Sequence, residues 1–325
     1  MSLQRTASVE AVTAAGGAGV TEVMHRVESR MAALVDGHGH LLAGHSRATI
    51  SAGGKRLRPL LVCLASGVPV LESDQLVRSA VAVELVHAAT LVHDDVLDGA
   101  ALRRGRPTVV AAGGRLVATA TGDLLFSRAF AELAGSGSIE AVRALSRAAS
   151  GLAAGELMQR EDAWKSSVTL ERYLERCRLK TAVLFRGACE LGAHSGGGPV
   201  HSLGAFGQAI GLAFQLLDDI LDVTGPPERT GKPRGADLLD GTVTLPLIVA
   251  RERNSQLASL DLRELRTADD AAEVSDRIIA TGALEVARDR ALGVVLQAKD
   301  ALPLLPDEQR SALELVADGV VERYS

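Results

Sequence analysis

The sequence predicts an all-α protein, and three observations support this fold class. Hydrophobic residues make up 47% of the chain but aromatic residues only 2%, so the apolar residues are mainly Ala, Leu and Val. Ala and Leu favour helices, whereas the aromatic-rich segments typical of strands are absent. Apolar residues recur at steps of three and four, for example at Val20, Met24, Val27 and Met31, and no segment alternates as a strand does. We therefore expect helices packed around a shared interior.

Turn signals separate the predicted helices. Ser73 followed by Asp74 is typical of a helix start, and the Gly-Ser-Gly-Ser run at 135–138 is typical of a turn. Residues 194–199 and 224–241 are rich in Gly or Pro and are expected to be loops. The predicted helical ranges are 20–34, 58–67, 74–97, 116–134, 139–163, 170–192, 203–223, 246–253, 271–281, 283–302 and 307–324.

Length and composition predict one domain. A flexible tail is expected over residues 1–19, which are rich in Ala, Gly, Ser and Thr, and a single domain over residues 20–325, because no later segment resembles a linker. The tail lacks the basic segment and apolar core of a secretory signal. No run of about 18 uncharged apolar residues predicts a transmembrane helix.

The charge and the cysteines limit the class of protein further. The formal net charge is −5, which argues against a nucleic-acid partner. The three cysteines, Cys63, Cys177 and Cys189, are widely spaced and have no zinc-ligand spacing. We therefore expect a reducing, cytoplasmic location.

Two aspartate clusters are the strongest functional signal. Residues 94–98 read Asp-Asp-Val-Leu-Asp and residues 218–222 read Asp-Asp-Ile-Leu-Asp, and each cluster follows an apolar helical run. The first and last aspartates of each cluster are four residues apart, so they lie one turn apart on the same helix face. Like charges at this spacing destabilise a helix, and so do acids near its C-terminus. The repeated pattern therefore indicates that cations bind there.

The chemistry of these clusters favours magnesium. Oxygen ligands suit a hard ion such as Mg²⁺, which also binds substrate phosphates, so we predict that magnesium ions and a diphosphate bind there. A solvated helix end would explain one such cluster more readily than two copies with matching apolar approaches. The candidate residues are Asp94, Asp95, Asp98, Asp218, Asp219 and Asp222, of which the predicted metal ligands are Asp94, Asp98, Asp218 and Asp222.

Basic residues near the clusters are candidates for diphosphate binding. Residues 53–59, Gly-Gly-Lys-Arg-Leu-Arg-Pro, combine three cations with glycines that let backbone N–H groups approach an anion. Arg103 and Arg104 follow Asp98 closely enough to reach the same phosphates. Taken alone, residues 53–59 also fit a solvated basic loop, and the two arginines also fit a role in balancing the charge of the nearby aspartates.

Single polar residues extend this candidate site. His87 lies two helical turns before Asp94, and Gln215 lies three residues before Asp218, each on the helix face of its cluster. Taken singly, a histidine on a helix is more often a packing residue, and a lysine is more often an ordinary surface residue. Three further candidates are Lys180, Thr181 and Lys232.

Together these residues resemble the trans-isoprenyl diphosphate synthases, also called polyprenyl synthetases. The resemblance covers the chain from about residue 20 to the C-terminus. It implies the isoprenoid synthase fold, a bundle of antiparallel helices around a deep central cavity, assembled as a homodimer. The matching motifs are Gly53-Gly54-Lys55-x-x-Arg58-Pro59, Asp94-Asp95-x-x-Asp98, Arg103-Arg104-Gly105, Lys180-Thr181, Gln215-x-x-Asp218-Asp219-x-x-Asp222 and Gly231-Lys232.

The resemblance also implies an activity and roles for residues. Such enzymes join isopentenyl diphosphate head-to-tail to an allylic diphosphate (geranyl, farnesyl or geranylgeranyl), with several Mg²⁺ ions in each active site. The implied catalytic residues are the six aspartates and Lys180. The residues implied for isopentenyl diphosphate are Gly54, Lys55, Arg58, His87 and Arg104. The residues implied for the allylic diphosphate are Arg103, Lys180, Thr181, Gln215 and Lys232.

One position departs from the family pattern. Thr242 stands where the family often carries a lysine, so one positive charge expected near the allylic diphosphate is missing. Lys180 and Lys232 remain. We therefore expect weaker contact with the allylic diphosphate.

Small residues before the first cluster predict a long product. Ala89 and Thr90 lie about one turn before Asp94, where short-chain members of the family often carry aromatic residues. Phe126 and Phe130, on a neighbouring helical stretch, are the candidate stops deeper in the cavity. The expected product is longer than farnesyl diphosphate. The alternative is that Ala89 and Thr90 only allow close helix packing.

Two other functions stay open. A terpene cyclase also uses aspartate clusters, but it has no need of a second-substrate site such as residues 53–58. A non-catalytic or regulatory partner subunit of a heteromeric synthase would not need two intact acidic clusters. The sequence therefore favours the synthase.

Overall fold

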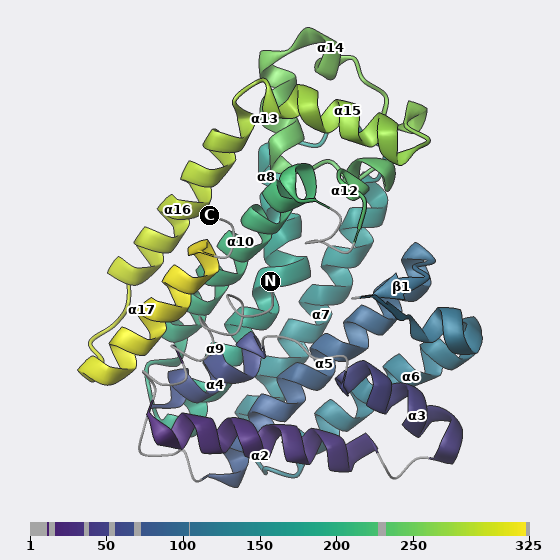
Figure 1. The fold of residues 1–325 in the computed structure, drawn as a ribbon. Helices are drawn as coiled ribbons and strands as arrows, with labels where there is room; N and C mark the ends of the chain where they lie inside the picture. The colour runs from purple at the N-terminus through teal and green to yellow at the C-terminus, as the bar shows by residue number, and fades with distance from the viewer. Residues whose placement is uncertain are drawn as a thin grey trace. The chain divides into compact units, whose positions relative to one another are not determined.

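The computed structural model describes residues 12, 17–35, 39–51, 56–67, 73–103, 105–226 and 232–322. Within these residues nearly all of the regular structure is helical (Figure 1), and the strands are the two-residue β1 (Leu102–Arg103) and β2 (Arg106–Pro107). The predicted all-α class is therefore confirmed. Most of the expected tail at 1–19 lies outside the described residues, so it stays a prediction.

The described residues belong to two compact units. The first unit contains residues 1–149, 184–207 and 302–316, and the second contains residues 150–183, 208–301 and 317–325. Most of the boundaries fall within helices, and the boundary after Ala301 follows the end of α16. The single domain expected over residues 20–325 stays a prediction.

Long helices form the first unit. They are α2 (Ala18–Val35), α3 (Gly39–Ser51), α4 (Leu57–Ser66), α5 (Asp74–Asp98), α6 (Val109–Ala134), the first part of α7 (Ile139–Asp162) and most of α9 (Val183–Gly196). The main contact is between α5 and α6, while α2 packs against α4 and α5 (Figure 1). Gly192 and Gly196 bring α9 onto the backbone of α4, since a Cβ at either glycine would overlap a carbonyl oxygen, that of Val62 or Ser66. These close contacts hold α9 directly against α4.

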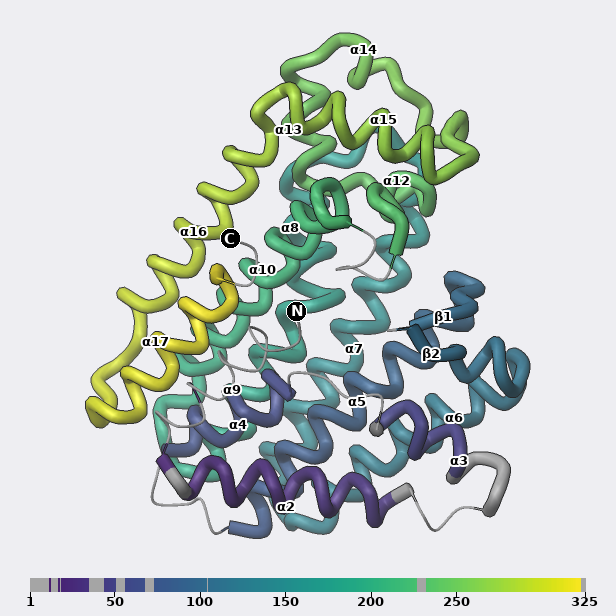
Figure 2. The backbone as a smooth tube through the Cα atoms, viewed as in Figure 1, coloured from purple at the N-terminus to yellow at the C-terminus, as the bar shows by residue number. Residues whose placement is uncertain are grey.

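Helices also build the second unit. They are α8 (Leu170–Cys177), the π-helical turn η2 (Arg178–Ala182), most of α10 (Val200–Thr224), α12 (Ala236–Leu239), α13 (Leu245–Arg253), α14 (Ser255–Ala258), η3 (Leu262–Glu264), α15 (Ala268–Ile279) and α16 (Ala283–Asp300). The last helix, α17 (Asp307–Glu322), belongs to both units. Within this unit α13 contacts α8, α14, α15 and α16. Figure 2 shows α12 lying beside α15, which it contacts.

Some local elements differ from the prediction. Helix α3 was not predicted, because its Gly, His, Ser and Thr residues have weak helix preference and it is held by contacts with α2, α5 and α6. The hairpin β1–β2 is too short for an alternating pattern. Helix α6 begins earlier than expected and is kinked at Gly114, whose φ of +78° suits glycine. Helix α9 extends to Gly196, so the loop expected at 194–199 is shorter.

Three helices, α5, α6 and α10, are long and apolar enough to cross a membrane by length and composition alone. Charged or polar residues interrupt the apolar run of each helix, for example His201 and Gln208 in α10, so none of them has the run of about 18 uncharged apolar residues by which a transmembrane helix would have been predicted. About 72% of the apolar window of α5 and 50% of that of α10 is buried inside the protein, against 28% for α6. Internal packing therefore accounts for the apolar character of the two helices that carry the aspartate clusters.

Candidate active site

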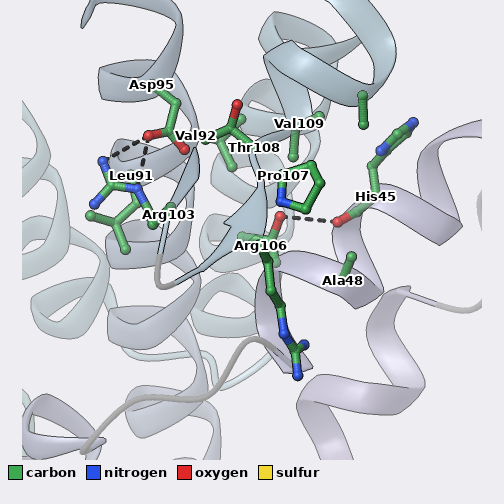
Figure 3. Close-up of a pocket in the computed structure, with 12 residues that line it drawn as sticks. His45, Ala48, Leu91, Val92, Asp95, Arg103, Arg106, Pro107, Thr108 and Val109 are labelled. Carbon is green, nitrogen blue, oxygen red and sulfur yellow. Dashed lines mark hydrogen bonds and ion pairs between the residues drawn. The ribbon is translucent and has the colours of Figure 1, made fainter. Parts of the chain in front are cut away.

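The first aspartate cluster closes α5. Asp95 is 4% exposed, whereas Asp94 is half-buried and Asp98 is exposed. The helix ends at Gly99, whose φ of +62° lets the chain turn toward β1. In β1, Arg103 places its Nε and Nη2 atoms 2.8 Å from Asp95 Oδ1 (Figure 3). A protein cation therefore neutralises the buried aspartate of this cluster.

A cavity of about 130 Å³ lies beside this ion pair (Figure 3). Its walls come from α3, α5, the β1–β2 hairpin and the start of α6. Asp95 and Arg103 give it a polar side, and Leu91 and Val92 give it an apolar one. Leu91 is four residues after His87 and three before Asp94, so it lies on the same helix face as those two residues. The cavity therefore adjoins the helix face expected to bind substrate.

Arg58 has the surroundings of an anion-binding residue. Its guanidinium lies over the ring of Phe185, 4.5 Å from the centroid, and Phe185 is fully buried. Burial lowers the pKa of Arg58 to about 10, although the carboxylate of Glu84 opposes this shift. Its buried Nε has no hydrogen-bond partner within the described part of the chain. A buried cation with an unused donor fits an anionic ligand.

The other residues implied for isopentenyl diphosphate are less informative. His87 is half-buried in α5, and its carbonyl oxygen accepts a hydrogen bond from Thr90 Oγ1 at 2.8 Å. Gly54, Lys55 and Arg104 lie outside the described residues. Their roles stay predictions.

The second aspartate cluster lies in the last turns of α10, where neutral donors hold its buried member. Tyr173 donates its hydroxyl to Asp219 Oδ2 at 2.6 Å, and Gln215 Nε2 donates to Asp219 Oδ1 at 2.7 Å. Thr181 Oγ1 donates to Gln215 Oε1 at 2.6 Å. Asp219 is 3% exposed. The structure thus brings together three residues that the sequence singled out and adds Tyr173, which it did not.

Carboxylates crowd this second cluster. Burial, reinforced by the neighbouring Asp237, raises the pKa of both Asp219 and Asp222. Burial also raises the pKa of Asp237. Lys232 opposes this rise, whereas the neighbouring carboxylate of Asp218 reinforces it. The backbone N–H of Asp237 donates to Asp222 Oδ2 at 3.3 Å. Asp237 was not predicted, because it falls in the Gly- and Pro-rich range 224–241 that was expected to be a loop, whereas the structure forms the short helix α12 there.

The donor set of the clusters fits a divalent cation. Each cluster offers two carboxylates one helical turn apart, which are hard oxygen donors that leave positions for phosphate and water. Burial and neighbouring carboxylates raise the pKa values in the second cluster, and Lys232 only partly opposes this rise at Asp222 and Asp237. Among the residues that the structure describes, no three His, Cys, Asp or Glu side chains are already grouped as one metal site.

Lys180 lies in the π-helical turn η2 next to Thr181. Its Nζ is 2.5 Å from Glu156 Oε2, and this ion pair, together with Arg160, holds the pKa of Glu156 low against the effect of burial. Gly155 lets the two segments approach, since a Cβ there would overlap the backbone nitrogen of Lys180. Lys232, the other candidate lysine of this unit, is exposed.

The loop that carries Thr242 is fixed. Thr242 is 9% exposed, and its backbone N–H donates to Asp237 O at 2.8 Å. Gly241 packs against the ring of Trp164, whose φ of +66° is unusual for a bulky residue. Arg176 Nη2 donates to the carbonyl oxygen of Val243. The side chain at position 242 therefore sits in a tightly held, largely buried segment.

The candidate chain-length residues lie on α5 and α6. Ala89 is completely buried, and Thr90 is half-buried. Phe126 stacks on His93 with ring centroids 5.8 Å apart, and Phe130 is half-buried. Burial of Ala89 is compatible with a role in packing or in lining a product cavity, so its role stays a prediction.

Comparison with known proteins places this site in a family. A model described as polyprenyl synthetase matches residues 40–280. Heptaprenyl diphosphate synthase component 2 from Geobacillus stearothermophilus is 40% identical over 278 residues, covering 82% of this chain and 85% of that protein. Octaprenyl diphosphate synthase from Escherichia coli is 34% identical, covering 84% of this chain and 87% of that protein. A solved polyprenyl synthase from Caulobacter crescentus, complexed with calcium and isoprenyl diphosphate, gives a TM-score of 0.88 and 35% identity over 98% of each chain.

The fold and these comparisons thus define a prenyl diphosphate synthase. The chain belongs to the polyprenyl synthetase family. Its helical architecture is the isoprenoid synthase fold of its structural relatives. The family resemblance drawn from the sequence motifs is therefore confirmed.

Proposed function

We propose that the chain is a Mg²⁺-dependent trans-prenyltransferase that condenses isopentenyl diphosphate head-to-tail with an allylic diphosphate. The observation that carries this proposal is the second cluster, where enclosed carboxylates crowd together and their pKa values rise. Such a group of carboxylates takes up protons unless cations neutralise it, so it favours the binding of cations. Divalent cations held there would leave positions for a diphosphate.

The aspartates of the two clusters would hold the metal. Asp94, Asp98, Asp218 and Asp222 are the proposed Mg²⁺ ligands, and Asp95 and Asp219 support them from buried positions. When bound there, Mg²⁺ would supply positive charge that neutralises the diphosphate and favours ionisation of the allylic C–O bond. The Caulobacter relative complexed with calcium and isoprenyl diphosphate supports a divalent cation at such a site.

Cations of the chain would bind and orient the two substrates. Arg58, held over Phe185, directs its guanidinium to isopentenyl diphosphate. Lys180, which pairs with Glu156 in this structure, would bind the allylic diphosphate. The double bond of isopentenyl diphosphate then attacks the allylic carbon, and a proton leaves to the departing diphosphate. Aliphatic side chains around the reacting carbon atoms would exclude water, which would otherwise react with the allylic carbocation.

The same relatives bear on product length and assembly. Heptaprenyl and octaprenyl diphosphate synthases are similar to this chain, which supports a product longer than farnesyl diphosphate. We expect a cytoplasmic homodimer. The phrase "component 2" in the name of one relative favours a second candidate, a catalytic subunit that needs another chain for activity.

The test is to incubate the purified chain with farnesyl diphosphate, labelled isopentenyl diphosphate and Mg²⁺, and to separate the products by chain length. We expect polyprenyl diphosphates longer than farnesyl, and no product when EDTA removes the metal. Asp218→Asn is the matched inactive control. A cyclised hydrocarbon, or no elongation at any Mg²⁺ concentration, would contradict the proposal. Elongation only after addition of a second subunit would favour the heteromeric candidate.

A further inference from the structure

The contact between Tyr173 and the second cluster goes beyond the roles given above. Tyr173 lies in α8 and is completely buried. A buried tyrosine hydroxyl needs a hydrogen-bond partner, and here it donates to Asp219 of α10 at 2.6 Å and also has a hydrogen bond with the Cys177 side chain. The second oxygen of Asp219 accepts from Gln215 Nε2 at 2.7 Å. Protein donors therefore occupy both oxygens of the buried aspartate.

The hydrogen bonds continue into η2. Gln215 Oε1 accepts from Thr181 Oγ1 at 2.6 Å, so the amide of Gln215 is oriented by a donor on one side and an acceptor on the other. Thr181 follows Lys180 directly in the π-helical turn. One chain of hydrogen bonds thus connects α8, α10 and the turn that presents Lys180.

The opposite side of η2 is fixed as well. Gly155 of α7 lies against the backbone of Lys180 so closely that a Cβ there would overlap it. The neighbouring Glu156 pairs with the Lys180 ammonium at 2.5 Å. The turn therefore has little freedom to move independently of the second cluster, because both of its sides are held.

We propose that Tyr173 is a positioning residue of the second cluster. Its hydroxyl fixes Asp219 as an anchor rather than a metal ligand, which leaves Asp218 and Asp222 to bind the cations. Through Gln215 and Thr181 the same anchor sets the position of η2, and with it Lys180, relative to those carboxylates. This inference rests on the proposed function, since it assigns a role within that same site.

Tyr173→Phe tests the proposal, because it removes one oxygen atom and keeps the buried ring. Outer residues that orient a metal site typically change metal affinity about tenfold or more. We expect the apparent affinity for Mg²⁺ in turnover to fall about tenfold. The KM for the allylic diphosphate should rise, and the KM for isopentenyl diphosphate should change by less than about twofold.

A second readout does not need turnover. The thermal midpoint of the full chain is measured with inorganic diphosphate over a range of Mg²⁺ concentrations. The wild type should be stabilised by Mg²⁺ and diphosphate together, and Tyr173→Phe should need about tenfold more Mg²⁺ for the same shift. Thr121→Val is the control, because Thr121 is also fully buried and its hydroxyl bonds only Val117 O within α6.

The outcomes separate this inference from the proposed function. If the wild type elongates substrate but Tyr173→Phe matches Thr121→Val in both readouts, the positioning role is wrong and the enzyme assignment stands. Equal increases in both KM values would also overturn it. If the wild type is inactive yet Tyr173→Phe still weakens the Mg²⁺-dependent stabilisation, the positioning role stands alone. Should Tyr173→Phe not fold, Gln215→Leu removes the other donor to Asp219 and must show the same Mg²⁺ dependence.

Discussion

In α5 the buried aspartate of the first cluster, Asp95, is bound by a guanidinium, whereas in α10 the buried aspartate of the second cluster, Asp219, is bound by a phenol and an amide. The first arrangement balances one negative charge with one positive charge. The second provides hydrogen bonds but no compensating charge. Two clusters with almost the same sequence therefore meet different electrostatic conditions.

This difference shows in the neighbouring carboxylates. Around the second cluster, burial and like charges raise the pKa of Asp219, Asp222 and Asp237. Around the first cluster, Asp98 is exposed to water and Asp95 already has its cation. We infer that the second cluster depends more on bound metal for its stability, and the predictions below test this contrast.

The largest expected effect is loss of turnover. Asp94→Asn and Asp218→Asn each remove one proposed ligand charge and should lower turnover at least about 100-fold at saturating Mg²⁺. Without metal, Asp218→Asn should raise the thermal midpoint, because it relieves like-charge repulsion, whereas Asp94→Asn should not. Steady-state kinetics and thermal unfolding measure both. Near-normal turnover in either variant would remove that aspartate from the site.

Product length should depend on the helix of the first cluster. Ala89→Phe is expected to shorten the main product to about farnesyl length while leaving catalysis intact, because an aromatic ring one turn before Asp94 would block the growing chain. Ala89→Val, a smaller enlargement at the same position, is the matched control. Chromatography of the products decides: an unchanged distribution in Ala89→Phe would mean that this face of α5 does not line the product cavity.

Binding of the two substrates should depend on different basic residues. Arg104→Ala should mainly raise the KM for isopentenyl diphosphate, and Lys180→Ala should mainly raise the KM for the allylic substrate. A charge-assisted contact contributes about 1.5–3 kcal/mol, so each increase should be roughly tenfold or more. If both variants change both KM values equally, the division into two substrate sites is wrong.

Stability should reveal the ion pair of the first cluster. Arg103→Ala leaves the buried carboxylate of Asp95 without its cation and should lower the free energy of unfolding by about 1.5–3 kcal/mol. Arg106→Ala, at an exposed position of the same hairpin, should change it by less than about 0.5 kcal/mol. Denaturant titration measures both variants. Equally small changes in the free energy of unfolding for both variants would show that the ion pair between Arg103 and Asp95 does not stabilise the fold.

The smallest effect concerns the cysteines, which lie in both units. Burial raises the pKa of Cys63 and Cys189 to about 12, and it raises that of Cys177 even further. Because the thiolate is the reactive form, the native chain should show almost no reaction with a thiol reagent at pH 8. Unfolding in guanidinium should expose all three. A rapidly reacting thiol in the native protein would place that cysteine at a mobile or open position.

The sequence predicted those features that depend on neighbours along the chain. Helix α2 was found because its apolar residues recur every three or four positions, and the start of α5 was found from Ser73 and Asp74. Helix α3 was missed, because its stability comes from contacts with other helices rather than from its own composition. The hairpin that carries Arg103 was missed because two-residue strands leave no pattern.

The sequence by itself determined the helical class and both aspartate clusters, because carboxylate spacing on a helix follows from the helix period alone. Only the tertiary structure decided what each cluster touches. Tyr173 is 46 residues from Asp219 in the chain, and Arg58 is far from Phe185. No local sequence pattern predicts such contacts, because they form only when separate helices pack together. The same packing determines that a cation binds the buried carboxylate of one cluster and that neutral donors bind the buried carboxylate of the other.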